Sequence, residues 1–136
     1  MIEADATLAR AALPRHADTN PSPASDDPTF AVLKRHAALW KAWGAAISRT
    51  DAAQEAFGEA SAAYHSAYDQ QQEIGDAACD YRDEVLITTV PRTAPGLAAY
   101  VAHVRGEKGY RDISAEEVFA DIMNTIQASL RLIQSN

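Results

Sequence analysis

Apolar residues recur along this chain at alternating steps of three and four, the spacing that places side chains on one face of an α-helix. The longest such run has a single polar member, Gln71, and comprises Phe57, Ala60, Tyr64, Ala67, Gln71, Ile74, Ala78, Tyr81 and Val85. It predicts a helix over 51–85, with Asp51 as the N-terminal cap and Gln54 completing a capping box. A seven-residue repeat sustained over this length favours pairing with a second helix in a left-handed supercoil.

A second apolar stripe precedes this run and predicts another helix. Asp27 can cap its free amides, and Pro28 suits its first position. The stripe consists of Phe30, Leu33, Ala37, Trp40, Gly44 and Ile47. Since Gly44 is the only helix breaker between Trp43 and Phe57, the two stripes could belong to one continuous helix or to a helical hairpin, and we favour the hairpin.

The remainder of the chain predicts a connector and two shorter helices. Residues 86–91 are rich in β-branched side chains and end in a proline, and no second strand is predicted to pair with them, so we expect an extended connector. Thr93 then caps a third helix with Pro95 in its first turn, and Gly106 and Gly109 end it. The apolar face of this helix comprises Leu97, Tyr100, Val101 and Val104.

The fourth predicted helix has the clearest start signal. Ser114 and Glu117 form a capping box, and Ile113 and Val118 occupy the hydrophobic-staple positions. The stripe that follows consists of Phe119, Ile122, Ile126, Leu130 and Ile133. Together these elements predict an all-α fold, in which a long, coiled-coil-like helical hairpin and two shorter helices form a helical bundle.

The first part of the chain differs from the rest in composition. Residues 1–27 contain Pro14, Pro21 and Pro23 and few large apolar side chains. Such a segment cannot bury enough surface to offset the entropy lost on ordering. We therefore expect a disordered N-terminal tail over 1–27 and a single all-helical domain over 28–136.

The net charge of −7 restricts the partners that this chain can bind. Affinity for nucleic acids and for anionic membranes comes largely from Lys and Arg, so we expect neither partner. No run approaches the ~18 apolar residues of a membrane span, and the acidic residues 1–5 do not resemble a secretory signal. Cys79 is the only cysteine and cannot form an internal disulfide, so we expect a cytoplasmic protein.

The charges are separated along the chain. Residues 28–50 carry four basic and no acidic side chains, whereas residues 51–85 carry nine acidic ones against Arg82 alone. Opposite charges favour pairing of the two helices, either within one chain or between two copies in a homodimer. The acidic surplus also forms a candidate surface for a basic protein partner, although a solvated face explains the same pattern; its residues are Glu73, Asp76, Asp80 and Asp83.

No motif for catalysis, metals or cofactors is recognisable. No glutamate lies three residues before His36, His65 or His103, which excludes the Glu-x-x-His di-iron motif. No His-x-x-x-His zinc motif, P-loop or nucleophile elbow occurs. Cys79 has acidic neighbours, which disfavour a reactive thiolate. We therefore predict no catalytic residue, no metal, no cofactor and no enzymatic activity.

Two further groups of side chains are candidates for binding. Arg92 and Thr93, at the start of the third helix, have the geometry of an anion site, although ordinary helix capping explains them equally well. Aromatic side chains at helical spacing could line a ligand pocket between the first two helices, or could simply be core; they are Trp40, Trp43, Tyr64 and Tyr68.

From Asp27 onwards the chain resembles a family of short helical proteins common in alphaproteobacterial genomes. The residues that carry the resemblance are the Asp27-Pro28 start, the segment 34–36 with Trp40, and the junction 89–100, which reads TVPRTAPGLAAY. The resemblance implies a bacterial all-helical protein. It implies no functional residues, because no activity is assigned to that family.

These observations support three hypotheses of different kinds. The first is a non-enzymatic helical interaction or assembly protein that associates with itself through its first two helices. The second is a small-ligand-binding or regulatory helical protein. The third, an enzyme of unrecognised type, has the least support, because no nucleophile–base pair is apparent.

Overall fold

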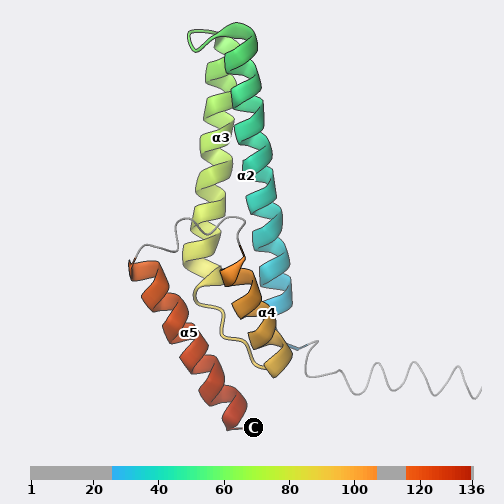
Figure 1. Cartoon of the computed structure of the whole chain (residues 1–136), viewed down its shortest axis with the longest axis vertical. Helices are drawn as coiled ribbons and strands as arrows, with labels where there is room; N and C mark the ends of the chain where they lie inside the picture. The colour runs from blue at the N-terminus through green and yellow to red at the C-terminus, as the bar shows by residue number, and fades with distance from the viewer. Residues whose placement is uncertain (1–25, 107–115, 136) are drawn as a thin grey trace, which may run out of the picture.

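A computed structural model shows an all-α chain in which a long helical hairpin stands on a base of shorter helices (Figure 1). The structure describes residues 26–106 and 116–135, with only the backbone described at 116–117. The elements in chain order are α2 (Thr29–Phe57), α3 (Ala62–Tyr81), η1 (Arg82–Leu86), α4 (Ala94–Arg105) and α5 (Glu116–Gln134). The predicted all-α fold, with a hairpin and two shorter helices, is confirmed.

The hairpin turns between α2 and α3, which lie side by side along their lengths (Figure 1). Gly58 ends α2 with a φ of 83°, a left-handed conformation that residues other than glycine rarely adopt. Ser61 then caps α3, since its Oγ accepts a hydrogen bond from the Tyr64 amide at 3.1 Å. This break excludes the continuous helix that the sequence left open.

The predicted start of the second helix at Asp51 is wrong. Asp51 lies inside α2 and is exposed, and the Gln54 side chain donates to Glu59 at 2.7 Å instead of forming a capping box. No residue over 50–57 breaks a helix, so α2 continues until Gly58. Consequently α3 is 20 residues long, and the predicted stripe is buried or partly buried only from Tyr64 onwards.

The apolar stripe predicted for the first helix is only partly correct. Its members Leu33 and Trp40 are buried or partly buried, but the others are exposed. The face that packs lies beside the predicted one and comprises Leu33, His36, Trp40, Trp43, Ala46 and Thr50. Two overlapping stripes on α2 therefore share Leu33 and Trp40, and the one containing polar residues is the buried one. The exposed members of the predicted stripe are Phe30, Ala37, Gly44 and Ile47.

A short π-helix, η1, links the hairpin to the connector before α4. Its wider turn is defined by the Ile87 amide, which donates to the Arg82 carbonyl at 3.0 Å. The predicted connector is found over 89–91, where the chain is neither helix nor strand, whereas Leu86 belongs to η1 and 87–88 form a turn. Side chains of α5, and not a neighbouring strand, donate to two carbonyls of this segment. The Ser129 hydroxyl donates to the Pro91 carbonyl at 2.7 Å, and the Thr125 hydroxyl donates to the Ile87 carbonyl.

The hydrophobic core lies at the base of the hairpin, where the connector meets α2, α4 and α5. Tyr100 on α4 is fully buried there, and its hydroxyl donates to the Leu86 carbonyl at 3.2 Å. The buried core comprises Leu33, Leu86, Ile87, Tyr100 and Ile122. This cluster joins every described helix except α3, which is held by α2 and η1.

The predicted ends of α4 are confirmed. Thr93 caps the helix by accepting the Gly96 amide at 3.0 Å, Pro95 lies in the first turn, and Gly106 follows the last residue. Three other predicted signals lie outside the described residues: Gly109 at the end of this helix, and Ile113 and Ser114 at the start of the fourth. The expected tail also lies outside them, apart from 26–27. None of the described helices combines the length and apolar character that crossing a membrane requires.

Candidate functional site

Asp27 joins the beginning of the hairpin to the beginning of α4. Its Oδ1 accepts the Thr29 amide at 3.1 Å and the Thr29 hydroxyl at 2.6 Å. Its Oδ2 accepts the amides of Arg92 and Thr93, each at 3.0 Å, and the Thr93 hydroxyl at 2.8 Å. Asp27 therefore does more than cap the first helix, because it also binds a segment more than 60 residues away.

This contact accounts for the predicted anion site at Arg92 and Thr93. The geometry does bind an anion, but that anion is the chain's own Asp27 carboxylate. Burial of Asp27 favours the neutral acid, yet its hydrogen bonds from Thr29, Thr93 and Arg92 outweigh this effect and hold the pKa of the carboxyl below its usual 3.8. A β-carbon on Gly96 would collide with this carboxylate, so the glycine is required by the close approach.

A histidine pair lies between α2 and α4. His36 Nδ1 and His103 Nε2 are 2.9 Å apart, so one ring nitrogen donates a hydrogen bond to the other. His36 is only 1% exposed, and His103 is partly buried. The Trp40 ring packs against His36 with ring centres 5.6 Å apart. The pair is thus held in place by buried packing from two helices.

The environment keeps both histidines neutral at pH 7. Burial lowers the pKa of His36 from 6.5 to about 4, and electrostatic repulsion from a protonated His103 and from Arg82 adds to this effect. Burial also lowers the pKa of His103. Arg82 itself, with its side chain 11% exposed, pairs with Asp83 at 2.8 Å. A neutral imidazole pair suits structural hydrogen bonding better than proton transfer near pH 7.

The sequence did not predict this pair, because the three histidines of the helices lie on three different helices. A signal was nevertheless present, since Leu33, His36, Trp40 and Trp43 follow the three-four spacing of a packed helix face. No local pattern could indicate that His103 faces His36. No group of three or more His, Cys, Asp or Glu side chains that could hold a metal ion occurs within 26–106 and 116–135.

The four aromatic residues of the predicted pocket form two pairs. Trp40 and Trp43 meet edge to face with ring centres 4.9 Å apart, and Tyr64 and Tyr68 lie 6.1 Å apart. The tryptophan pair adjoins the histidines, whereas the tyrosines lie near the turn of the hairpin. No ring contact between the pairs is found in the described part of the chain, and a shared pocket stays a prediction.

Trp43 packs directly on α3 at Gly75. A β-carbon placed on Gly75 would lie 2.8 Å from the Trp43 ring, so only glycine allows this approach. The Trp43 Nε1 atom is buried and has no hydrogen-bond partner among the described residues. Trp43 therefore combines a close contact with α3 and, within the described part of the chain, a buried donor without an acceptor.

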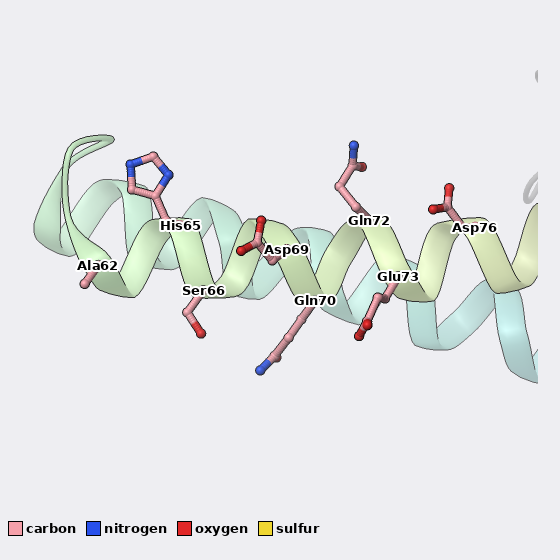
Figure 2. Close-up of a pocket in the computed structure, with 8 residues that line it drawn as sticks. All are labelled: Ala62, His65, Ser66, Asp69, Gln70, Gln72, Glu73 and Asp76. Carbon is pink, nitrogen blue, oxygen red and sulfur yellow. The ribbon is translucent and has the colours of Figure 1, made fainter.

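The predicted acidic surface is exposed along α3 and at the start of η1. Glu73, Asp76, Asp80 and Asp83 are all exposed, and Asp83 pairs with Arg82. A shallow hollow on α3 is lined by residues of this helix alone, Glu73 and Asp76 among them. Figure 2 shows the Glu73 side chain on one side of the helix and the Asp76 side chain on the other. Because no second element closes over them, the acids form a face and do not surround a ligand.

The exposed side of α2 carries apolar residues at regular intervals. Phe30, Ala37 and Gly44 are spaced by seven, and Ile47 follows one turn later. Phe30 is 41% exposed and Ile47 is 37% exposed. These four residues, which we name the α2 row, have the spacing of a packed helix face, yet each of them is exposed.

Comparisons of this chain with protein-family models, with curated proteins and with solved structures find no match. The resemblance to alphaproteobacterial helical proteins therefore stays a hypothesis.

Proposed function

We propose that this chain is a non-enzymatic helical interaction protein that associates with itself through the α2–α3 hairpin. The observation that carries the proposal is the α2 row, an apolar row with a seven-residue repeat that faces solvent. Such a repeat is the pattern by which one helix packs along another. A second copy that packs along this row would cover its exposed apolar side chains.

The form of the hairpin supports this proposal. The hairpin extends well beyond the base formed by α4 and α5, so the outer sides of its helices are accessible (Figure 1). Two small residues, Ala37 and Gly44, lie in the middle of the α2 row, and a β-carbon on Gly44 would have no neighbour within 4 Å. Small residues allow helix backbones to approach closely. Two hairpins that pair in this way form a four-helix bundle, a stable arrangement for such helices.

A cytoplasmic location belongs to the same proposal. Its support is that Cys79, the only cysteine of the sequence, cannot form a disulfide within the chain.

Sedimentation of the full chain across micromolar concentrations tests the proposal. We expect the wild type to self-associate reversibly. Replacement of Ile47 by aspartate should weaken association by more than about tenfold, because it buries a charge within the contact. Phe57→Asp is the matched control, since Phe57 is also in α2 and 68% exposed but lies at the turn, off the α2 row. A wild-type chain that stays monomeric throughout would refute the proposal.

A second candidate function, binding of a small ligand, is favoured by one observation. The buried Trp43 indole N–H lacks an acceptor among the described residues, and it lies beside Trp40 and the histidine pair. A ligand with an acceptor atom could satisfy it. Tryptophan fluorescence titrated with pools of metabolites and anions tests this function. Unchanged emission and unchanged thermal stability with every pool would remove its support.

A further inference from the structure

We infer that α2 of one copy packs against α3 of its partner, so that a basic edge of the α2 row meets the acidic face of α3. This inference rests on the proposed self-association and names the contact that produces it. Its starting point is the position of two lysines. Lys34 and Lys41 each follow a member of the α2 row, Phe30 and Ala37, by four residues, and both are exposed. At this spacing they border the row on the helix surface.

The opposite charge lies on the outer side of α3. Asp69, Glu73, Asp76 and Asp80 are exposed and follow one another at steps of four, three and four. In Figure 2 the Asp69 and Asp76 side chains project from one side of the helix and the Glu73 side chain from the other. These acids and Lys34 and Lys41 make no ion pair within the part of the chain that the structure describes, where the observed pair is Arg82 with Asp83. Both charged edges are therefore open to a second copy.

Charge selects among the ways in which two hairpins can face each other. Packing α2 against α2 would bring the lysine edges together, and packing α3 against α3 would bring the acidic faces together. Like charges placed opposite each other disfavour both arrangements. Packing α2 against α3 of the partner opposes lysines to acids and still covers the α2 row. The second copy carries the same two surfaces, so each copy can supply either side of the contact.

The two parts of the contact have different roles. Each exposed ion pair contributes only about 0–1 kcal/mol and is screened by salt. The α2 row therefore supplies most of the affinity, through burial of apolar surface. The charges decide which helices meet, as edge charges do in coiled coils. Association should consequently weaken, without disappearing, as the salt concentration rises.

Charge reversal in the full chain tests the inference. One variant carries Lys34→Glu and Lys41→Glu, and the other carries Asp76→Lys and Asp80→Lys. At low salt we expect each alone to associate more than about tenfold more weakly than the wild type, because the reversed side chains then face charges of their own sign. An equimolar mixture should recover association to within about threefold of the wild type, since each variant then meets its complement.

Two further variants keep the result interpretable. Lys34→Gln with Lys41→Gln removes the charges without reversing them and should weaken association less than the glutamates do. Arg131→Glu changes an exposed charge on α5, away from the hairpin, and should leave association unchanged. Circular dichroism of every variant confirms that helix content is retained.

The outcomes separate this inference from the proposed function. If the wild type associates but the mixture of charge variants does not recover, the pairing of α2 with α3 is wrong while self-association stands. If the charge variants associate as the wild type does at low salt, the same conclusion holds. If the wild type is monomeric, the proposed function fails first. Recovery in the mixture alone supports the inference.

Discussion

His36 and His103 are joined by a hydrogen bond of 2.9 Å between ring nitrogens, although 67 residues separate them in the chain. The bond connects α2 to α4 at the base of the hairpin. Asp27 makes a second connection between the same two parts of the chain through Thr93. The imidazoles are neutral and the carboxylate is ionised in these two contacts, and both conditions are met near pH 7.

The histidine pair should make stability depend on pH in the mildly acidic range. The pKa of His36 is 6.5 in an unperturbed state and about 4 in the folded chain, so the unfolded chain takes up the proton first as pH falls. The free energy of unfolding should therefore be constant above the higher value and decrease between the two. The expected loss is about 3 kcal/mol, and urea unfolding at several pH values measures it.

A His36→Gln variant isolates this contribution. Glutamine does not titrate but can still form a hydrogen bond. Its unfolding free energy should change much less over the same pH range. An unaltered pH dependence in this variant would assign the effect to other groups.

Replacement of Asp27 should destabilise the fold strongly. In Asp27→Ala the amides of Arg92 and Thr93 lose their acceptor at a site where Asp27 is only 4% exposed. A loss of about 2–4 kcal/mol in urea unfolding is expected. Asp27→Asn keeps one acceptor oxygen and should lose less. Asp26→Asn, at the exposed neighbour, should stay within about 0.5 kcal/mol of the wild type; equal effects at both positions would contradict the role given to Asp27.

Two glycines on the hairpin should respond oppositely to alanine. A β-carbon at Gly75 would lie 2.8 Å from the Trp43 ring, whereas one at Gly44 would meet nothing within 4 Å. Gly75→Ala should therefore cost about 1–3 kcal/mol through overpacking. Gly44→Ala should stabilise α2 by about 0.5–1 kcal/mol, because alanine favours the helix. Thermal unfolding at one low protein concentration compares them, and stabilisation by both would show that Trp43 does not pack tightly on α3.

The Ser129 hydroxyl should contribute measurably to holding α5 against the connector. It is fully buried and donates to the Pro91 carbonyl at 2.7 Å. Ser129→Ala should cost about 1–3 kcal/mol in urea unfolding, because the carbonyl loses its donor. Ser135 makes a comparable bond to Leu132 at 2.9 Å, but in an exposed position. Ser135→Ala should therefore have almost no effect, and a similar loss in both would mean that burial is not the cause.

Local sequence patterns were sufficient to predict the four α-helices of this fold, but not all of their ends and not η1. The cap at Thr93, the proline in the first turn of α4 and the end at Gly106 each satisfy backbone groups within a few residues, so they can be recognised without the rest of the molecule. The connector before Pro91 is recognisable for the same reason. The turn at Gly58 was not predicted because the capping pattern at Asp51 also fits the local rules for a helix start. In the structure α2 continues through Asp51 and ends at Phe57.

By itself the sequence determined that the chain forms amphipathic helices, that two of them are long enough to pair, and where opposite charges lie along them. Only the tertiary structure decided which of two overlapping stripes on α2 is buried, that Asp27 fills the anion site at Thr93, and that His36 meets His103. The physical reason is that spacing along a helix places residues on a face, whereas the partner of that face is chosen by packing between distant segments. At one point of this packing Gly75 admits the Trp43 ring, so the side of α2 that carries Trp43 faces α3.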